Sequence, residues 1–170
     1  SRVVVIGGGN VAIDSARSAL RVGAREVEIV YRRTQDQMPA HRWEIEEAER
    51  EGVSFRYLVS PSKLLGKDKV EGIECIRMEL GNYEPTGRRK PVPVKGSEFI
   101  IEADTVITAI GQESEARTLL GKEGFAVDPY TLATNQKGVF AGGDFRGGKA
   151  MVIEAIADGK KAAHSISLFL

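Results

Sequence analysis

The sequence has few of the residues that build redox and metal centres. Its 170 residues include one cysteine, Cys75, and two histidines, His41 and His164. A single cysteine excludes an internal disulfide, a CxxC redox pair, a four-cysteine zinc site and a self-contained iron–sulfur cluster. Cys75 lies in the alternating stretch GIECIRMEL, which favours a small apolar residue in a strand. The histidines lie far apart in separate predicted helices, and we expect no metal site.

The chain also lacks an excess of charge of either sign and any long hydrophobic run. Its 24 Lys+Arg balance its 24 Asp+Glu, so no global basic field attracts nucleic acid or an anionic membrane. Any phosphate recognition must therefore be local. No run of about 18 apolar residues and no signal peptide is found, and we expect a cytoplasmic protein. Because Ser1, not Met, leads directly into a predicted strand, we expect a piece of a longer polypeptide.

A βαβ unit opens the chain. Residues 2–7, RVVVIG, form a short apolar run ending in glycine, as expected of a strand buried on both faces of a parallel sheet. Residues 10–22 carry apolar or small side chains at helical spacing, and Gly23 follows where a C-capping glycine belongs. Residues 26–32, EVEIVYR, predict the second strand. The unit has about the minimum length for a right-handed crossover.

The next segment changes from helical to period-two patterning. A charged helix is predicted around residues 40–51, and from 53 to about 102 the stretches VSFRYLVS, KVEGIECIRMEL and SEFIIEA read as strands. PSKLLGKD and GNYEPTGRRKPVPVKG are expected to be the segments between them. Residues 103–111, ADTVITAIG, predict a buried strand that completes the first sheet. We predict an α/β fold, a Rossmann-like doubly wound parallel sheet with an inserted antiparallel β-meander.

A composition shift at about residue 112 marks the end of this first domain, which we place at residues 1–111. Beyond it the sequence is polar, and then predicts a short strand at 138–141 and a closing helix from about residue 150. Residues 112–170 therefore form a separate segment of the chain.

The turn after the first strand fits the dinucleotide fingerprint G-x-G-x-x-G/A. Gly7 permits a tight turn, Gly9 leaves no Cβ between the backbone and a pyrophosphate, and Ala12 lets the helix pack closely on the strand. The free N–H groups and the positive end of the helix would face two phosphates. Strand, helix and second strand all lie where the motif requires them, which favours dinucleotide binding over a merely structural turn. The predicted site comprises Gly7, Gly8, Gly9, Asn10, Val11 and Ala12.

The end of the second predicted strand bears on which dinucleotide binds. An NAD site commonly carries an acidic residue there, which accepts hydrogen bonds from the ribose 2′-OH. This sequence has Arg32 and Arg33 instead, and the planar donors of arginine pair with phosphate oxygens. We predict NADP(H), with both arginines on the 2′-phosphate; the alternative is two solvated arginines at a strand end.

The tail carries pieces of what could be a second nucleotide site. A three-residue apolar run, 139–141, ends in Gly142, Gly143 and Asp144. Glycines let the backbone approach a ligand, and a carboxylate at a strand's carboxyl end can accept hydrogen bonds from sugar hydroxyls. The stretch GGKAMV then opens the final helix, whose amides could donate to a carbonyl or an anion.

These motifs together give the chain a strong resemblance to the C-terminal part of the glutamate synthase small (β) subunit family. Relatives in this family include the NADPH-binding region of dihydropyrimidine dehydrogenase and the flavin subunit of bifurcating ferredoxin:NADP oxidoreductases. The resemblance covers nearly the full length and is carried by VVVIGGGNVAIDSAR, VEIVYRR, QMPA, EGIECIRMEL, ADTVITAIGQ, GVFAGGD and VIEAIADGKKAA.

The resemblance implies roles for further residues. It implies that Arg32 and Arg33 hold the 2′-phosphate and that the strand end at Ala109, Ile110 and Gly111 lies between the nicotinamide and a flavin. It also implies that residues 112–170 are the C-terminal segment of an FAD-binding domain whose N-terminal half is absent. The implied FAD-contacting residues of this segment are Gly143, Asp144, Ala150, Met151 and Val152. The sequence departs from the family at Gly148-Lys149, where a proline-containing pair is more usual.

The implied activity is that of an NADPH-dependent flavoprotein oxidoreductase. Hydride would pass between NADPH and FAD, and electrons would then reach iron–sulfur clusters and an acceptor such as a glutamate synthase large subunit. The cofactors carry this chemistry, so no catalytic side chain is expected. We expect NADP(H) on this chain and FAD in the full-length protein only, because the other half of the FAD domain and the iron–sulfur domain, its expected partners, are missing here.

Two other interpretations stay open. The chain could be a stand-alone subunit that completes its FAD site with another chain, or a non-catalytic dinucleotide-binding or interaction module. We also expect self-association through the C-terminal helix, by way of Val152, Ile156 and Ile166, because its apolar face would otherwise lack a partner.

Overall fold

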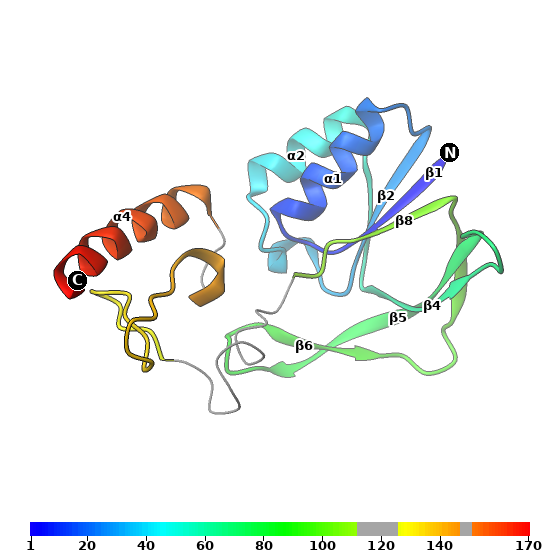
Figure 1. Ribbon diagram of the computed structural model, residues 1–170. Coiled ribbons are helices and arrows are strands. Elements are labelled where there is room, and N and C mark those ends of the chain that lie inside the picture. The colour runs from blue at the N-terminus through cyan, green and yellow to red at the C-terminus, as the bar shows by residue number, and fades with distance from the viewer. Residues whose placement is uncertain (112–125, 147–150) are drawn as a thin grey trace. The chain divides into compact units, whose positions relative to one another are not determined.

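The computed structural model describes residues 1–111, 126–146 and 151–170 (Figure 1). The chain divides into two compact units, Ser1–Gly111 and Gln112–Leu170.

A four-stranded parallel sheet forms the centre of the first unit, with the strand order β3-β2-β1-β8. Ile6 at the end of β1 is in register with Val30 of β2 on one side and with Thr108 of β8 on the other. The carboxyl ends of these strands therefore meet at one edge of the sheet. The strands are β1 (Arg2–Ile6), β2 (Glu26–Tyr31), β3 (Ser54–Tyr57) and β8 (Thr105–Thr108).

Two helices, α1 (Asn10–Arg21) and α2 (Arg42–Glu51), lie side by side on one face of this sheet (Figure 1). The buried side chains of α1 pack with those of α2 and with alternate residues of β1 and β2 in one core cluster. Both helices end at a glycine with positive φ, Gly23 at +100° and Gly52 at +103°. The amide of Ala24 donates to the carbonyl of Ala19 at 3.0 Å, which closes the end of α1.

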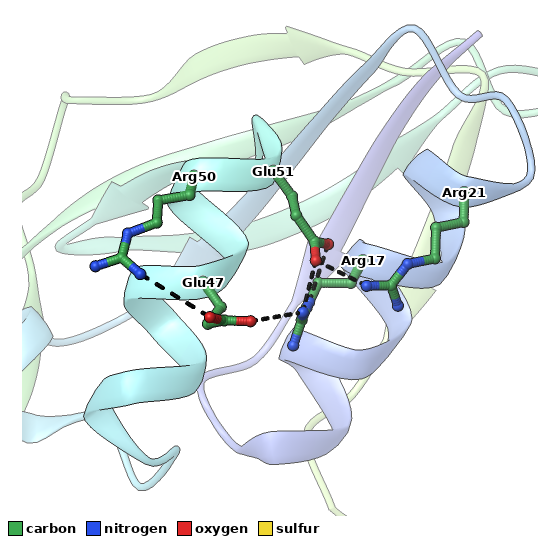
Figure 2. Close-up of polar contacts among 5 residues, drawn as sticks. All are labelled: Arg17, Arg21, Glu47, Arg50 and Glu51. Carbon is green, nitrogen blue, oxygen red and sulfur yellow. Dashed lines mark hydrogen bonds and ion pairs between the residues drawn. The ribbon is translucent and has the colours of Figure 1, made fainter.

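An ion-pair network joins the solvent side of the two helices (Figure 2). Arg17 Nη2 lies 2.5 Å from Glu51 Oε1 and 3.2 Å from Glu47 Oε2, and Arg21 Nη2 lies 2.7 Å from Glu51 Oε1. Arg50 Nη1 lies 3.9 Å from Glu47 Oε1, on the side of Glu47 opposite Arg17 (Figure 2). The hydrogen bond from Arg17 lowers the pKa of the Glu51 carboxyl below its usual range. The network thus links helices that adjoin on the sheet but are separated by β2 in sequence.

The inserted antiparallel sheet lies on the other face of the parallel sheet (Figure 1). A second core cluster contains Val4 and Val30 of the parallel sheet together with Val59, Ile73 and the fully buried Cys75. The strand order of the antiparallel sheet is β4-β5-β6, with β7 also paired to β5. The strands are β4 (Val59–Leu65), β5 (Gly72–Tyr83), β6 (Arg89–Pro93) and β7 (Phe99–Glu102).

These observations confirm the predicted fold class, and they correct the boundaries of the meander. The stretch expected as one strand, VSFRYLVS, is broken at Leu58, whose φ is +55°. Two stretches expected to lie between strands contribute to strands themselves. Pro61 lies in β4 next to a register shift at the edge of the sheet, and β6 contains two prolines. Proline is tolerated at edges and bulges, so its presence was a poor signal of a loop here.

In the second unit, two isolated bridges, Val127 with Thr134 and Ala133 with Phe140, precede a short 3₁₀ turn, η2 (Gly143–Arg146). The expectation of a strand at 138–141 is therefore wrong: among the described residues, this stretch contributes only the bridge of Phe140 with Ala133. The final helix, α4, runs over Val152–Phe169. None of the helices in the described ranges is long and apolar enough to cross a membrane.

Candidate functional site

Three segments from separate parts of the sequence meet at the carboxyl edge of the parallel sheet. The amide of Gly7 donates to the carbonyl of Val30 at 3.1 Å, and the amide of Ala109 donates to the carbonyl of Ile6 at 2.7 Å. The glycine turn after β1 is thus anchored between the ends of β2 and β8. The structure brings together the predicted residues Gly7 to Ala12, Arg32 and Ala109 to Gly111.

The first two glycines of the turn are required by close packing. Gly7 has a φ of +147°, and a Cβ there would lie 2.2 Å from the carbonyl oxygen of Ala109. A Cβ on Gly8 would lie 2.4 Å from the ring of Tyr31, whose hydroxyl donates to the carbonyl of Gln37 at 2.8 Å. Each glycine therefore lets a neighbouring strand approach the turn.

The third glycine is not required by close packing, in contrast to the first two. A Cβ on Gly9 would have Pro39 Cγ, at 3.9 Å, as its nearest neighbour. Gly9 is the N-cap of α1, and its carbonyl accepts from the amides of Ala12 and Ile13. Within the described parts of the chain, the amides of Asn10 and Val11 have no acceptor, as is usual for the first turn of a helix. An approaching anion would meet these amides and the positive end of the helix.

A loop that sequence reasoning left without a role folds over this turn. The amide of Ala40 donates to the carbonyl of Gly8 at 3.1 Å, and the amide of His41 donates to the side-chain oxygen of Asn10 at 3.1 Å. Asn10 thus uses its side chain to hold the start of α2. The QMPA stretch, noticed only as part of the resemblance, was the signal that could have located this contact.

The two arginines after β2 have different surroundings. Arg32 is exposed. Arg33 has a side chain that is 3% exposed; its Nε donates to the carbonyl of Arg89 at 2.9 Å, and its Nη2 lies 2.8 Å from Glu84 Oε2. Both partners belong to the β5–β6 hairpin. The expectation that both guanidinium groups contact a 2′-phosphate stays a prediction, and the structure presents only that of Arg32 to solvent.

The segment after β8 completes this edge of the sheet. Ala109 packs under Gly7 as part of the core around α1, whereas Ile110 is 75% exposed. Gly111 has a φ of +92°. An exposed apolar side chain beside a glycine turn could contact a flat ring, the role that the resemblance implies for this strand end.

In the second unit, the predicted ligand residues lie on η2 and at the start of α4. Gly143 and the exposed Asp144 belong to η2, whereas Met151 is the N-cap of α4 and Val152 its first residue. Ala150, the remaining predicted residue, lies outside the described residues.

Asp158 of α4 holds the η2 turn. Its Oδ2 accepts from the amide of Gly143 at 2.9 Å and from Arg146 Nε at 2.5 Å. The hydrogen bond from Arg146, followed by that from Gly143, lowers the pKa of the Asp158 carboxyl below its usual range. A Cβ on Gly142 would lie 2.9 Å from the Cβ of Asp158. This buried carboxylate, not predicted from the sequence, fixes the turn that carries Asp144.

The parallel sheet with its glycine turn, covering helices and inserted antiparallel sheet defines an α/β protein with a fold of the dinucleotide-binding type. The chain belongs to the pyridine nucleotide-disulphide oxidoreductase family, whose model matches residues 1–159. Together with the relatives described next, this match confirms the resemblance drawn from the sequence motifs.

Two relatives illustrate this membership. The β subunit of the NADP(+)-dependent formate dehydrogenase of Moorella thermoacetica is 51% identical over 99% of this chain. The small chain of the glutamate synthase [NADPH] of Azospirillum brasilense is 40% identical over 98% of it. The chain covers 25% of the first relative and 36% of the second. It therefore corresponds to a part of these longer proteins.

A solved structure shows the same fold. FprA of Mycobacterium tuberculosis in complex with NADPH matches 99% of this chain, with a TM-score of 0.78 and 21% sequence identity, and the match covers 52% of the FprA chain.

Proposed function

We propose that this chain is the NADP(H)-binding portion of a flavin-dependent oxidoreductase. One observation carries the proposal: the start of α1, the exposed Arg32 and the strand end at Ala109–Gly111 follow three neighbouring strands at the carboxyl edge of the parallel sheet. Among the described residues, the amides of Asn10 and Val11 at the start of α1 have no acceptor. The amides suit a pyrophosphate, the guanidinium suits a ribose 2′-phosphate, and the strand end suits the nicotinamide ring. The names of the two relatives, which include NADP(+) and NADPH, agree with this assignment.

Arg32 is the residue that would select NADP(H) over NAD(H). A guanidinium forms paired hydrogen bonds with phosphate oxygens but has no such partner in a bare 2′-hydroxyl. Its exposed position at the end of β2 is the place where an NAD site carries an acidic residue.

The second unit has residues that fit part of an FAD site. The Asp144 carboxylate is exposed on a turn rich in glycine, so sugar hydroxyls could reach it, and Met151 and Val152 begin α4. We propose that Gly143, Asp144, Ala150, Met151 and Val152 contact FAD in the complete protein. When bound, the flavin would accept or donate the hydride that the nicotinamide exchanges. This chain would bind and orient the dinucleotide and exclude water from it.

The matched relatives are a β subunit and a small chain of larger enzymes. We therefore propose that the complete protein passes electrons on to a partner subunit by way of iron–sulfur clusters outside this chain, a glutamate synthase large subunit being one candidate acceptor.

The test is a titration of the purified chain with NADPH and with NADH. Trp43, the only tryptophan, lies in the first turn of α2 and is 60% exposed. Its emission overlaps the absorption of a reduced nicotinamide, so quenching reports binding. We expect NADPH to bind more tightly than NADH, and Arg32→Ala to remove roughly 10- to 100-fold of that preference. Equal affinities in the unmodified chain, or an unchanged preference in Arg32→Ala, would contradict the proposal.

Flavin absorbance of the same preparation tests the assignment of FAD. We expect little or no FAD on the isolated chain, whereas FAD bound near stoichiometry would contradict the proposal that the flavin needs residues outside it.

A further inference from the structure

The proposed function leaves the β5–β6 hairpin and the buried Arg33 without a role. We propose that Arg33 is a positioning residue: it docks the β5–β6 hairpin against the end of β2 and thereby fixes the backbone that presents Arg32 to the 2′-phosphate. The inserted antiparallel sheet then supports the NADP(H) site through its contacts with Arg33. This inference rests on the proposed function.

The first support is the geometry of the Arg33 side chain. With 3% of its surface exposed, its guanidinium is held by the carbonyl of Arg89 at 2.9 Å and by the carboxylate of Glu84 at 2.8 Å. A buried guanidinium with two such partners is satisfied where it is. To reach a phosphate in solvent it would have to break both contacts and leave Glu84 without its counter-charge.

The second support is that the hairpin is itself a fixed structure. Arg89 Nε donates to the carbonyl of Gly81 at 2.9 Å, and its Nη2 donates to the carbonyl of Leu80, so this side chain ties β6 to β5. The amide of Glu84 donates to the carbonyl of Arg88 at 2.8 Å, which closes the tip. The backbone that carries both partners of Arg33 is therefore held by contacts within the hairpin, independently of Arg33.

The third support is that the backbone of Arg33 is fixed as well. Its carbonyl accepts from the amide of Leu58 at 3.1 Å, at the break between β3 and β4. Arg33 is thus anchored through both its backbone and its side chain, while Arg32 next to it remains exposed. An immobile neighbour limits the conformations open to Arg32, so less entropy is lost when Arg32 binds a phosphate.

Glu84 offers a test in which the two roles of Arg33 predict opposite signs. If Arg33 positions Arg32, removing the Glu84 carboxylate loosens the contact between the hairpin and Arg33. Glu84→Ala should then reduce the preference for NADPH over NADH roughly three- to tenfold. If Arg33 instead binds the phosphate directly, Glu84→Ala frees its guanidinium from a competing anion, and the preference should rise. Glu79→Ala is the matched control, because Glu79 is exposed on the same hairpin but is not the carboxylate paired with Arg33.

The full experiment is a set of NADPH and NADH titrations of the 170-residue chain carrying Arg33→Ala, Glu84→Ala, and both together. We expect Arg33→Ala and Glu84→Ala to lower the preference for NADPH by similar factors, and the double variant to lower it no further. A thermal melt of each variant shows that it is folded.

Three results would overturn the inference: a preference that rises in Glu84→Ala, a preference unchanged in Glu84→Ala, or losses that multiply in the double variant. Failure of the proposed function looks different, because the unmodified chain would then show no preference for NADPH at all. If Arg32→Ala loses the preference and Glu84→Ala keeps it, the proposed function stands and the positioning role of Arg33 is wrong.

Discussion

Replacing Gly7 with alanine should destabilise the first unit far more than the same change at Gly23. Both glycines have positive φ, +147° and +100°, and an alanine in such a conformation costs about 1–3 kcal/mol. At Gly23 nothing lies within 4 Å of the added Cβ. At Gly7 the added Cβ would lie 2.2 Å from the carbonyl oxygen of Ala109. This contact is with backbone, so β1 and β8 must move apart, at a further cost of about 1–3 kcal/mol.

The buried Cys75 thiol provides the assay. It is the only cysteine and is 0% exposed between the two sheets of the first unit, so a thiol reagent modifies it only when that unit opens. When reclosing is fast, the labelling rate follows the population of the open form, and each 1.4 kcal/mol of lost stability raises it about tenfold. We expect Gly7→Ala to label roughly 5- to 100-fold faster than Gly23→Ala. Equal labelling rates in the two variants would refute the close approach of the glycine turn to β8.

The remaining predictions concern the thiol and the second unit. Burial raises the pKa of Cys75 to about 11, so in the native chain the thiol should react slowly at pH 8, and quickly only after denaturation; rapid labelling of the native chain would contradict its burial. The lowered pKa of Asp158 means that its pairing with Arg146 stabilises the turn above the ordinary aspartate pKa and is lost as the pH falls below that range. Circular dichroism against pH should therefore show an acid transition that Asp158→Asn removes, and a transition unchanged in that variant would count against the pairing. Val152 is 78% and Ile156 is 55% exposed on α4, so sedimentation should show self-association that Ile156→Glu weakens; a monomer at all concentrations would argue against it.

The sequence predicted best those features that depend on neighbouring residues. Local glycines and helical spacing indicate the glycine turn and the ends of the first two helices. In the structure, Gly9 is the N-cap of α1, and Gly23 and Gly52 lie at the ends of α1 and α2. The strands of the antiparallel sheet were harder to delimit, because proline in an edge strand looks like a loop in the sequence.

Contacts between distant residues could not be predicted. Arg33 pairs with Glu84, 51 residues away, and nothing in the run of two arginines distinguishes the buried one from the exposed one. Gly8 was likewise predicted only as part of the dinucleotide site, and the ring of Tyr31, which leaves no room for a Cβ there, is brought against it by the fold. Such contacts arise from the packing of the insertion and of β2, which a local pattern does not encode.

We propose that a dinucleotide lies on the glycine turn with its 2′-phosphate at Arg32. The most direct measurement is an NMR titration of the isotope-labelled chain with NADPH and with NADH. We predict that both ligands shift the backbone amides of Asn10 and Val11, and that only NADPH shifts the side chain of Arg32. Shifts confined to residues 126–170, or an Arg32 signal that responds equally to both dinucleotides, would contradict the claim.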